Sequence, residues 1–173
     1  NDIQLVVLAA GKGTRMNSDL PKVLTLLAGK PLVAHLLAHV DSVGFTHKPV
    51  IIVGHKAELV QQALGPKYRY VIQNEQRGTG HAVRCAQPIV EGEAEDVMVL
   101  YGDHPLIDSE TIRKIASAHL AGNSPLTMAT VNVDDFSDWR DGFRRWGRIV
   151  RDSAGAIVRN VEYKDSTEAE RVI

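Results

Sequence analysis

The sequence predicts an α/β fold, with a three-layer, Rossmann-like, mostly parallel sheet, helices on both faces and a C-terminal β-hairpin. Short apolar runs rich in branched residues alternate with helical patterns from residue 3 to about residue 133. Such alternation is typical of parallel sheets joined by right-handed crossovers. Glycines follow several of the apolar runs directly. Because ligands of such sheets bind beyond the carboxyl ends of the strands, we expect function in these glycine-containing loops.

The strands are predicted from continuous apolar runs. Residues 3–9 form the first run, which ends before Gly11, as expected of a strand buried on both faces. A second run stops at Gly54. The strands predicted after the first are residues 50–53, 70–72, 97–101 and 126–133.

The helices are predicted from apolar residues at helical spacing. Residues 31–43 show this spacing, and Gly44 is placed to end the helix. Ser109 is a residue type that caps a helix start, so we expect it to cap the last helix. The helices predicted after the first are residues 57–64, 80–89 and 109–120.

The last part of the chain follows a different pattern. Residues 147–151 and 156–161 flank an Asp-Ser-Ala-Gly turn, which predicts an antiparallel hairpin. Residues 134–145 are rich in charged and aromatic side chains and are predicted to form a surface excursion. We expect residues 1–173 to form a single domain.

Composition excludes several functional classes. The 173 residues carry a net charge of −1 and are 44% hydrophobic, enough for a sizeable core. The charge is balanced, so it gives no indication of a nucleic-acid or membrane surface. No apolar run reaches the ~18–20 residues of a membrane helix. Cys85 is the single cysteine, so no intrachain disulfide can form. We expect a cytoplasmic protein without nucleic-acid or membrane partners, and leave a homo-oligomer open.

The loop after the first strand has the character of a phosphate site. Gly11 and Gly13 let the backbone approach a ligand closely, and successive N–H groups in such a turn bind anions. Ala9 and Ala10 leave room for a flat base. The nearby cations are Lys12, Arg15 and Lys22. An ordinary strand–loop transition with exposed cations is the alternative.

Two better-known phosphate loops do not match this segment. The dinucleotide-binding pattern needs a third glycine where Met16 stands. A Walker A loop needs Gly-Lys-Ser/Thr after four spacer residues, and the loop lacks it. A Rossmann oxidoreductase is therefore a remote alternative.

Asp103 and Gln73 are the other candidate ligand residues. Asp103 follows a predicted buried strand, and magnesium binds through one or two carboxylates plus substrate phosphates. A turn aspartate is the alternative interpretation. The amide of Gln73 offers a donor and an acceptor that suit a pyrimidine edge. Alternatively, its loop caps the helix near Gly80. His81 is interpreted as a helix-start residue and not as an acid or base.

Five motifs together resemble a known family. Leu8-Ala-Ala-Gly-x-Gly-Thr-Arg-Met16 with Pro21-Lys22 resembles the signature loop of the sugar-phosphate nucleotidyltransferases. Four further matches follow in the family's order. The resemblance is strongest to the uridyltransferase domains of the bacterial bifunctional N-acetylglucosamine-1-phosphate uridyltransferases. The four matches are Gln73-Asn-Glu-Gln-Arg-Gly-Thr-Gly-His-Ala82, Tyr101-Gly-Asp-His-Pro-Leu106, Gly147-Arg-Ile-Val-Arg151 and Val161-Glu-Tyr-Lys-Asp165.

The resemblance implies a nucleotide-diphospho-sugar transferase fold and a function. The implied reaction is Mg²⁺-dependent uridylyl transfer from UTP to a sugar 1-phosphate, foremost N-acetylglucosamine 1-phosphate, for cell-wall precursors. The implied catalytic residues are Arg15, Lys22 and Asp103, and Asp103 also binds the metal. The implied nucleotide-binding residues are Leu8, Ala9, Ala10, Gly11, Gly13, Thr14, Gln73, Gly78 and Thr79. The implied sugar-binding residues are Tyr101, Gly102, Gly147 and Glu162, with Lys164 balancing the charge of Glu162.

Two departures from the family leave alternatives open. Residues 139–146 are longer and more aromatic than the family's turn, and Trp146 stands where a tyrosine is common, which leaves the acceptor sugar open. Two asparagines that hold the sugar and the metal in the family would lie beyond Ile173, which implies either a chain truncated at its C-terminus or incomplete metal binding. The alternatives are transfer from dTTP, CTP or GTP, or a non-catalytic nucleotide-sugar-sensing domain.

Overall fold

The first of two compact units is built on a parallel sheet. The computed structural model describes residues 2–13 and 19–172, and its units are Asn1–Met128 and Ala129–Ile173. The sheet has the order β5-β4-β1-β6, and every neighbouring pair is parallel. Its strands are β1 (Ile3–Ala9), β4 (Val50–Val53), β5 (Arg69–Ile72) and β6 (Asp96–Tyr101).

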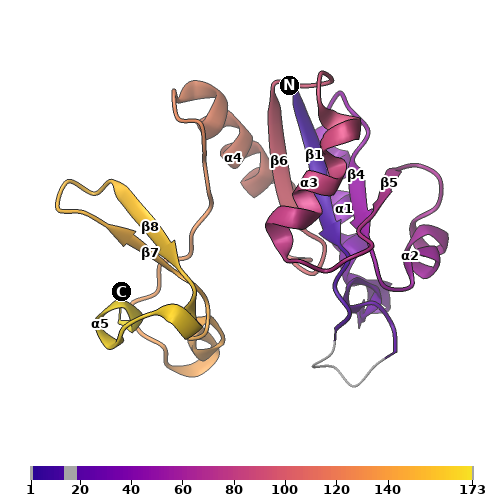
Figure 1. Cartoon of the computed structure of the whole chain (residues 1–173). Coiled ribbons are helices and arrows are strands. Elements are labelled where there is room, and N and C mark those ends of the chain that lie inside the picture. The colour runs from indigo at the N-terminus through magenta and orange to yellow at the C-terminus, as the bar shows by residue number, and fades with distance from the viewer. Residues whose placement is uncertain (1, 14–18, 173) are drawn as a thin grey trace. The chain divides into compact units, whose positions relative to one another are not determined.

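Helices cover both faces of this sheet. Figure 1 shows α3 in front of the sheet and α1 behind it. Alternate β1 residues explain the two cores: Leu5 and Val7 pack with residues of α1, α2 and α4, whereas Val6 and Leu8 pack with α3. The three-layer prediction is therefore confirmed. The helices are α1 (Leu32–Val43), α2 (Ala57–Leu64), α3 (Thr79–Val90) and α4 (Ser109–Ala121).

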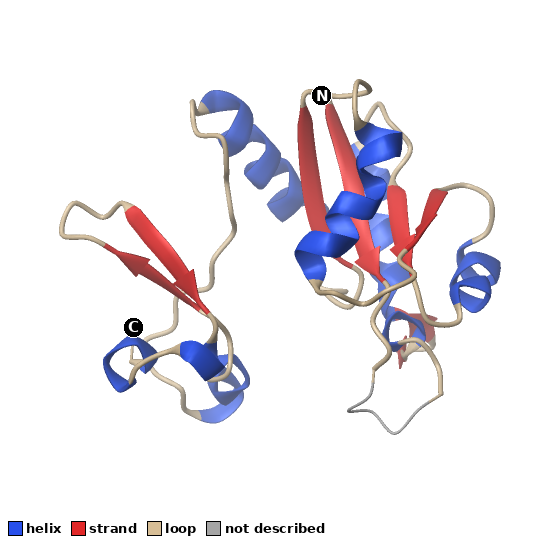
Figure 2. Cartoon of the chain, in the orientation of Figure 1, coloured by secondary structure: helices blue, strands red, loops and turns tan. Residues whose placement is uncertain are grey.

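The order of the strands defines a switch point between β1 and β6. From β1 the chain moves outward to β4 and then β5, and it returns to the other side of β1 for β6. A right-handed crossover then requires α3 to lie on the opposite face from α1 and α2, as it does. The arrowheads of β1, β4, β5 and β6 point the same way in Figure 2, so the loops after β1 and β6 leave the same edge of the sheet. Sheets of this type bind ligands at such a switch point.

Short elements complete the chain. A 3₁₀ turn, η2 (Lys22–Leu24), precedes a two-residue hairpin of β2 (Leu26–Leu27) and β3 (Lys30–Pro31). The predicted C-terminal hairpin is confirmed, since β7 and β8 pair antiparallel. The second unit contains η3 (Asp138–Phe143), β7 (Arg148–Arg151), β8 (Ile157–Val161), η4 (Tyr163–Asp165) and α5 (Glu168–Arg171).

The predicted fifth strand at residues 126–133 is wrong. The segment has no strand or helix, and Leu126, Met128 and Val131 are exposed. β-branched sequence favours a strand only where a neighbouring strand and a packed face accept it, and this segment pairs with no strand of the described chain.

The predicted cap of α4 at Ser109 is also wrong. Asp108 is the N-cap, and its Oδ1 accepts a 2.7 Å hydrogen bond from the backbone N–H of Thr111. A carboxylate accepts this bond, and its negative charge interacts favourably with the positive end of the helix dipole.

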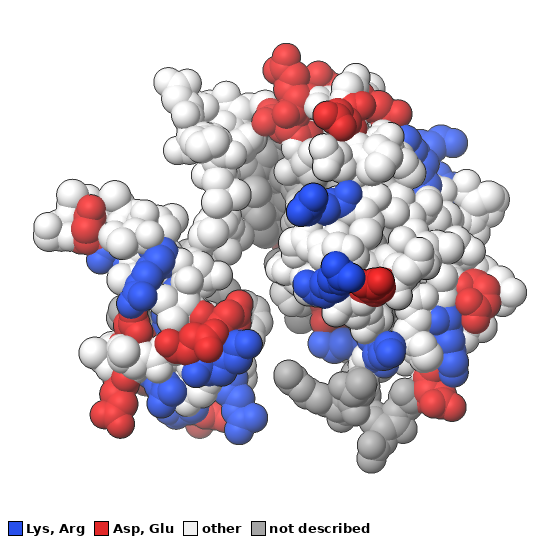
Figure 3. All heavy atoms as spheres, in the orientation of Figure 1, with Lys and Arg blue, Asp and Glu red and all other residues white. Residues whose placement is uncertain are grey.

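Figure 3 shows Lys or Arg and Asp or Glu side chains on the drawn face of each unit, with a group of acidic side chains at the top of the view. Within the part of the chain that is described, no helix has the length and apolar character to cross a membrane.

Candidate functional site

The loop after β1 returns to the sheet at Lys22. Val23 and Leu24 are buried, so η2 is anchored in the core and fixes the backbone of Lys22 beside the end of β1. Gly13 has φ of +66°, and a Cβ there would lie 3.1 Å from Lys22 Cβ. The loop can therefore pass close to Lys22 only with glycine at this position. Thr14 and Arg15, two predicted site residues, lie outside the described residues.

Asp103 reaches the same place from β6. Gly102 donates a 2.9 Å backbone hydrogen bond to Leu8 O, which joins the loop after β6 to the end of β1. Lys22 Nζ lies 2.5 Å from Asp103 Oδ2, although the two residues are 81 positions apart. The pair is only partly exposed on its acidic side, with 23% of the Asp103 side chain accessible. A cation and a carboxylate thus meet at the switch point.

Gln73 lies at the end of β5, beside the loop after β1. Its backbone N–H donates to Val53 O at 2.7 Å, and its side chain is buried. It lines a pocket of about 300 Å³. The pocket lies at the carboxyl ends of β1, β4 and β5. The other lining residues are Lys12, Gly54, His55, Ile72, Asn74 and Gln76.

The backbone residues predicted around the nucleotide are distributed over the same edge. Leu8, Ala9 and Ala10 are buried at the end of β1, whereas Gly11 is exposed. Gly78 and Thr79 are exposed at the start of α3, where Gly78 is the N-cap. Every one of these positions belongs to the first unit, together with Lys22, Gln73 and Asp103.

Three residues near this site were not predicted to act there. Gln76 Nε2 donates to Ala10 O at 2.7 Å and brings its loop over the end of β1. His55 lines the pocket after β4, and His81 contacts Gln73. Gln76 and His81 stand inside the second motif, so the motif was the signal. For His55 the signal was only its position after Gly54.

The predicted sugar residues divide between the two units. Tyr101 is 44% exposed at the end of β6, where its ring contacts His104, and Gly102 is buried next to it. Gly147 and Glu162 lie in the second unit, directly beyond the β7–β8 pair of Arg148 and Val161. The hairpin therefore brings these two positions together.

Glu162 and Lys164 are exposed, and no ion pair joins them in the described structure. The expected charge balance of Glu162 by Lys164 is therefore not a direct contact.

The site offers oxygen ligands for a hard cation. The described residues contain no group of three or more His, Cys, Asp or Glu side chains that could hold a metal ion. Asp103 supplies one carboxylate at the strand end. Magnesium commonly binds proteins in this way, because substrate phosphates and water complete its shell. The donor set therefore fits Mg²⁺ bound together with a nucleotide.

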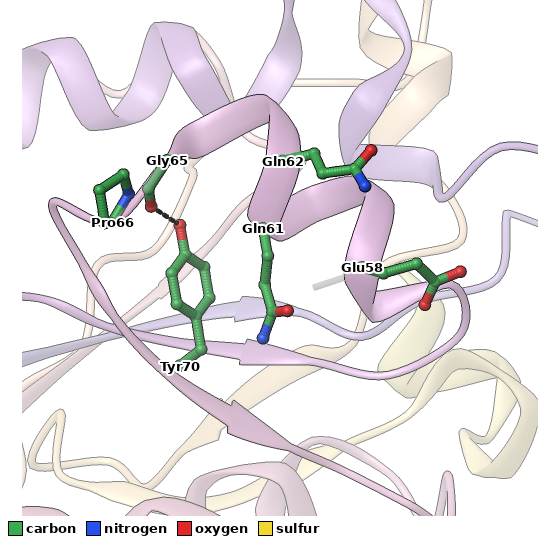
Figure 4. A pocket seen from close by; sticks show the side chains of 6 residues that line it. All are labelled: Glu58, Gln61, Gln62, Gly65, Pro66 and Tyr70. Atoms are coloured by element: carbon green, nitrogen blue, oxygen red, sulfur yellow. Dashed lines mark hydrogen bonds between the residues drawn. The ribbon is translucent and has the colours of Figure 1, made fainter.

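A second depression has different chemistry. It has a volume of about 500 Å³ between α2 and β5, and its lining contains no cation (Figure 4). Tyr70 donates a 2.6 Å hydrogen bond to Gly65 O, drawn as the dashed line in Figure 4. Burial raises the pKa of the Tyr70 hydroxyl, so it remains protonated and a donor at neutral pH. This arrangement stabilises the turn after α2 and provides no phosphate-binding group.

Phosphate chemistry suits the strand-end arrangement, since backbone amides, a lysine and a carboxylate converge where α/β sheets bind nucleotides. The fold and the site together thus define a class: the α/β proteins that transfer nucleotidyl groups. Comparison of the sequence shows the family directly: the chain belongs to the MobA-like NTP transferase domain family, whose model matches residues 5–136.

Curated relatives agree with the resemblance found in the motifs. The chain is 42% identical over 168 residues to the bifunctional protein GlmU of an Exiguobacterium species, covering 97% of this chain and 36% of the relative. It is 43% identical over 172 residues to the bifunctional protein GlmU of Cellvibrio japonicus, covering 99% of this chain and 36% of the relative. The chain thus spans about a third of the length of these relatives. The predicted relationship is confirmed: this is a sugar-phosphate nucleotidyltransferase chain close to GlmU.

Solved structures share the fold. HddC from Yersinia pseudotuberculosis complexed with GMP-PN has a TM-score of 0.69 and 27% identity, covering 92% of this chain and 68% of that chain. Rv0371c from Mycobacterium tuberculosis has a TM-score of 0.62 and 26% identity, covering 70% of this chain and 62% of that chain.

Proposed function

We propose that the chain transfers the uridylyl group of UTP to a sugar 1-phosphate, most favourably N-acetylglucosamine 1-phosphate, giving a UDP-sugar and pyrophosphate. The 2.5 Å contact of Lys22 with Asp103 at the β1–β6 switch point carries the proposal. A nucleotide whose phosphates lie there has its base within reach of the Gln73 pocket along the same edge. The motif around Gln73, which resembles that of the uridyltransferases, supports uracil as the base, and the cytoplasm is the proposed place of reaction.

The proposed chemistry needs no covalent enzyme intermediate. An oxygen of the sugar 1-phosphate attacks the α-phosphorus of UTP, and the new P–O bond forms in line with the bond to the bridging oxygen. That bond breaks, and pyrophosphate leaves with the electron pair. The acceptor phosphate is already ionised at neutral pH, so the protein has to position the reactants and stabilise charge.

Each strand-end residue has a role in this scheme. Lys22 neutralises charge that develops around the α-phosphate. The amides of Gly11 and Gly13, together with Arg15, hold the leaving pyrophosphate. Asp103 would hold Mg²⁺, which stabilises charge on the phosphate oxygens when bound. The proposed sugar-binding residues are Tyr101, Gly102, Gly147 and Glu162.

A different base is the main alternative within the family. The structural relative HddC is complexed with GMP-PN, so guanylyl transfer is the competing reaction. Because Asp103 is the single predicted metal ligand, a non-catalytic sensor is the second alternative. The sensor alternative predicts binding of UTP or a UDP-sugar without turnover.

Pyrophosphate release is the decisive measurement. The chain should release pyrophosphate from UTP with N-acetylglucosamine 1-phosphate in Mg²⁺, release much less with dTTP, CTP or GTP, and stop when EDTA is added. A panel of other sugar 1-phosphates ranks the acceptor. Binding of UTP by calorimetry, without pyrophosphate release from UTP in the presence of any acceptor, would contradict the enzyme and favour the sensor.

A further inference from the structure

The side-chain amide of Gln73 has both of its N–H donors engaged. Nε2 lies 3.2 Å from Gly78 O and 3.0 Å from His81 Nδ1. A backbone carbonyl can only accept, so it requires the NH₂ group, and not the amide oxygen, to face Gly78. The second N–H of Gln73 is then directed at His81. This network assigns the orientation of the amide.

The state of His81 follows from this contact. Its Nδ1 must carry a lone pair to accept from Gln73, so the proton of the neutral ring is on Nε2. That nitrogen lies 4.0 Å from Cys85 Sγ, one turn further along α3. His81 is half-buried in the first turn of the helix. The contact of His81 with Gln73 is therefore made from a helix, α3, which fixes the position of the ring.

Only the amide oxygen of Gln73 remains available to a ligand. Oε1 makes no hydrogen bond to the described residues and is not among their fully buried, unpartnered atoms. Gln73 lines the 300 Å³ pocket, and Oε1 is the side-chain acceptor of this residue that is left for a ligand there. An acceptor pairs with the imide N3–H of uracil or thymine. It is mismatched with the bare ring nitrogen of cytosine.

We propose that His81 is a positioning residue that sets base preference by holding the Gln73 amide with its oxygen toward the base. The inference rests on the proposed function, because it assumes that the base occupies this pocket. A terminal amide has two nearly equivalent orientations about its last torsion. With the lone pair of His81 present, the reversed orientation makes two acceptor–acceptor contacts, one with Gly78 O and one with Nδ1. Without His81 it makes one.

The proposal is tested by base discrimination in matched variants. His81→Leu removes the acceptor, whereas His81→Asn keeps an amide oxygen near the position of Nδ1. Cys85→Ala is the control on the same helix, because Cys85 Sγ lies against Nε2 of the ring and not against Nδ1. The measurements are kcat and KM for UTP and CTP by pyrophosphate release, and dissociation constants of both nucleotides by calorimetry.

His81→Leu should lower the UTP-to-CTP ratio of kcat/KM about tenfold, the effect of one misplaced buried hydrogen bond. The change should appear in KM and in the dissociation constants and not in kcat, because base contacts are made equally in ground and transition states. His81→Asn should recover most of the ratio, and Cys85→Ala should keep it. If His81 had a merely structural role, its loss would instead weaken the binding of UTP and of CTP by the same factor.

The outcomes separate this inference from the function on which it rests. An unmodified chain that prefers UTP, combined with a folded His81→Leu variant that keeps the same ratio, overturns the role of His81 alone. An equal loss of kcat/KM for UTP and CTP also overturns it, as does a His81→Asn variant that does not recover the UTP-to-CTP ratio. An unmodified chain without preference for UTP overturns the proposed uridylyl transfer and the inference together.

Discussion

At the scale of single residues, charge placement decides the chemistry at the switch point. Lys22 and Asp103 come from loops 81 positions apart, and the core packing of Val23 and Leu24 holds one of them in place. An exposed ion pair of this kind contributes little to stability. Because the pair lies where phosphates are expected, we expect it to matter more for binding and catalysis than for folding.

Replacing either member of this pair should affect turnover more than stability. Lys22→Ala and Asp103→Asn should each lower kcat/KM about 10²–10³-fold, the usual effect of removing one electrostatic contact to a transition state. The melting temperature should change little. Lys114→Ala is the matched control, since Lys114 pairs with Glu110 on the exposed face of α4. Near-normal turnover in Lys22→Ala or Asp103→Asn would remove these residues from the mechanism.

Gly102 should tolerate a side chain poorly. An added Cβ would lie 3.0 Å from Leu8 O and 3.1 Å from Val23 Cγ1, so the backbone leading to Asp103 or these neighbours would have to give by a few tenths of an ångström. Gly102→Ala should therefore lower both the melting temperature and, by about tenfold or more, kcat/KM. Gly142→Ala is the control, because a Cβ at Gly142 meets nothing within 4 Å. Equal behaviour of the two variants in thermal melts and pyrophosphate release would show that close approach at Gly102 is unimportant.

Motif residues could be selected from the sequence, but their contacts could not. Glycines and charges after apolar runs indicate which residues reach the sheet edge. Hydrogen bonds such as Gln76 to Ala10 O, or Gln73 to His81, depend on how a loop folds over a neighbouring strand. That path is set by tertiary packing and has no periodic signature in the chain. The sequence therefore identified Gln73 and did not identify the residue that orients it.

At the scale of elements, periodicity predicted the helices and central strands closely. The predicted helix at residues 57–64 has the same bounds as α2, and the other three helices differ by one residue or a few. Apolar periodicity reports burial against a sheet, which is what these elements experience. β2 and β3 were missed because two residues each leave no pattern to detect. The strand predicted at residues 126–133 failed because pairing, unlike propensity, is not local.

The N-cap of α4 gives a pH-dependent prediction. Backbone and side-chain hydrogen bonds from Thr111 lower the pKa of Asp108 below its ordinary value of 3.8. A depressed carboxyl pKa stabilises the fold above the unfolded pKa, and this stability is lost as pH falls through the folded pKa. Asp108→Ala should lower the melting temperature by a few degrees at pH 7 and by less near pH 3. A difference that stays constant over this range in thermal melts would exclude the charged cap.

At the scale of the whole molecule, both apolar cores belong to one of the two units. Every buried residue of the two clusters lies between Ile3 and Ala116, within the unit Asn1–Met128. The same unit contains Lys22, Gln73 and Asp103, whereas Gly147 and Glu162 belong to Ala129–Ile173. Folding and nucleotide binding are therefore expected to depend on the first unit.

This division predicts the behaviour of a fragment that ends at Met128. The fragment should keep the helical circular-dichroism signal, unfold cooperatively within several degrees of the full chain, and bind UTP with an affinity within a few-fold. Pyrophosphate release with N-acetylglucosamine 1-phosphate should fall sharply, because Gly147 and Glu162 are removed. Glu162→Gln in the full chain is the matched variant, and it should raise KM for the sugar 1-phosphate while leaving UTP binding unchanged. A fragment that loses cooperative unfolding would instead support the single domain of residues 1–173 that the sequence suggested, since the sheet would then depend on residues beyond Met128 to fold.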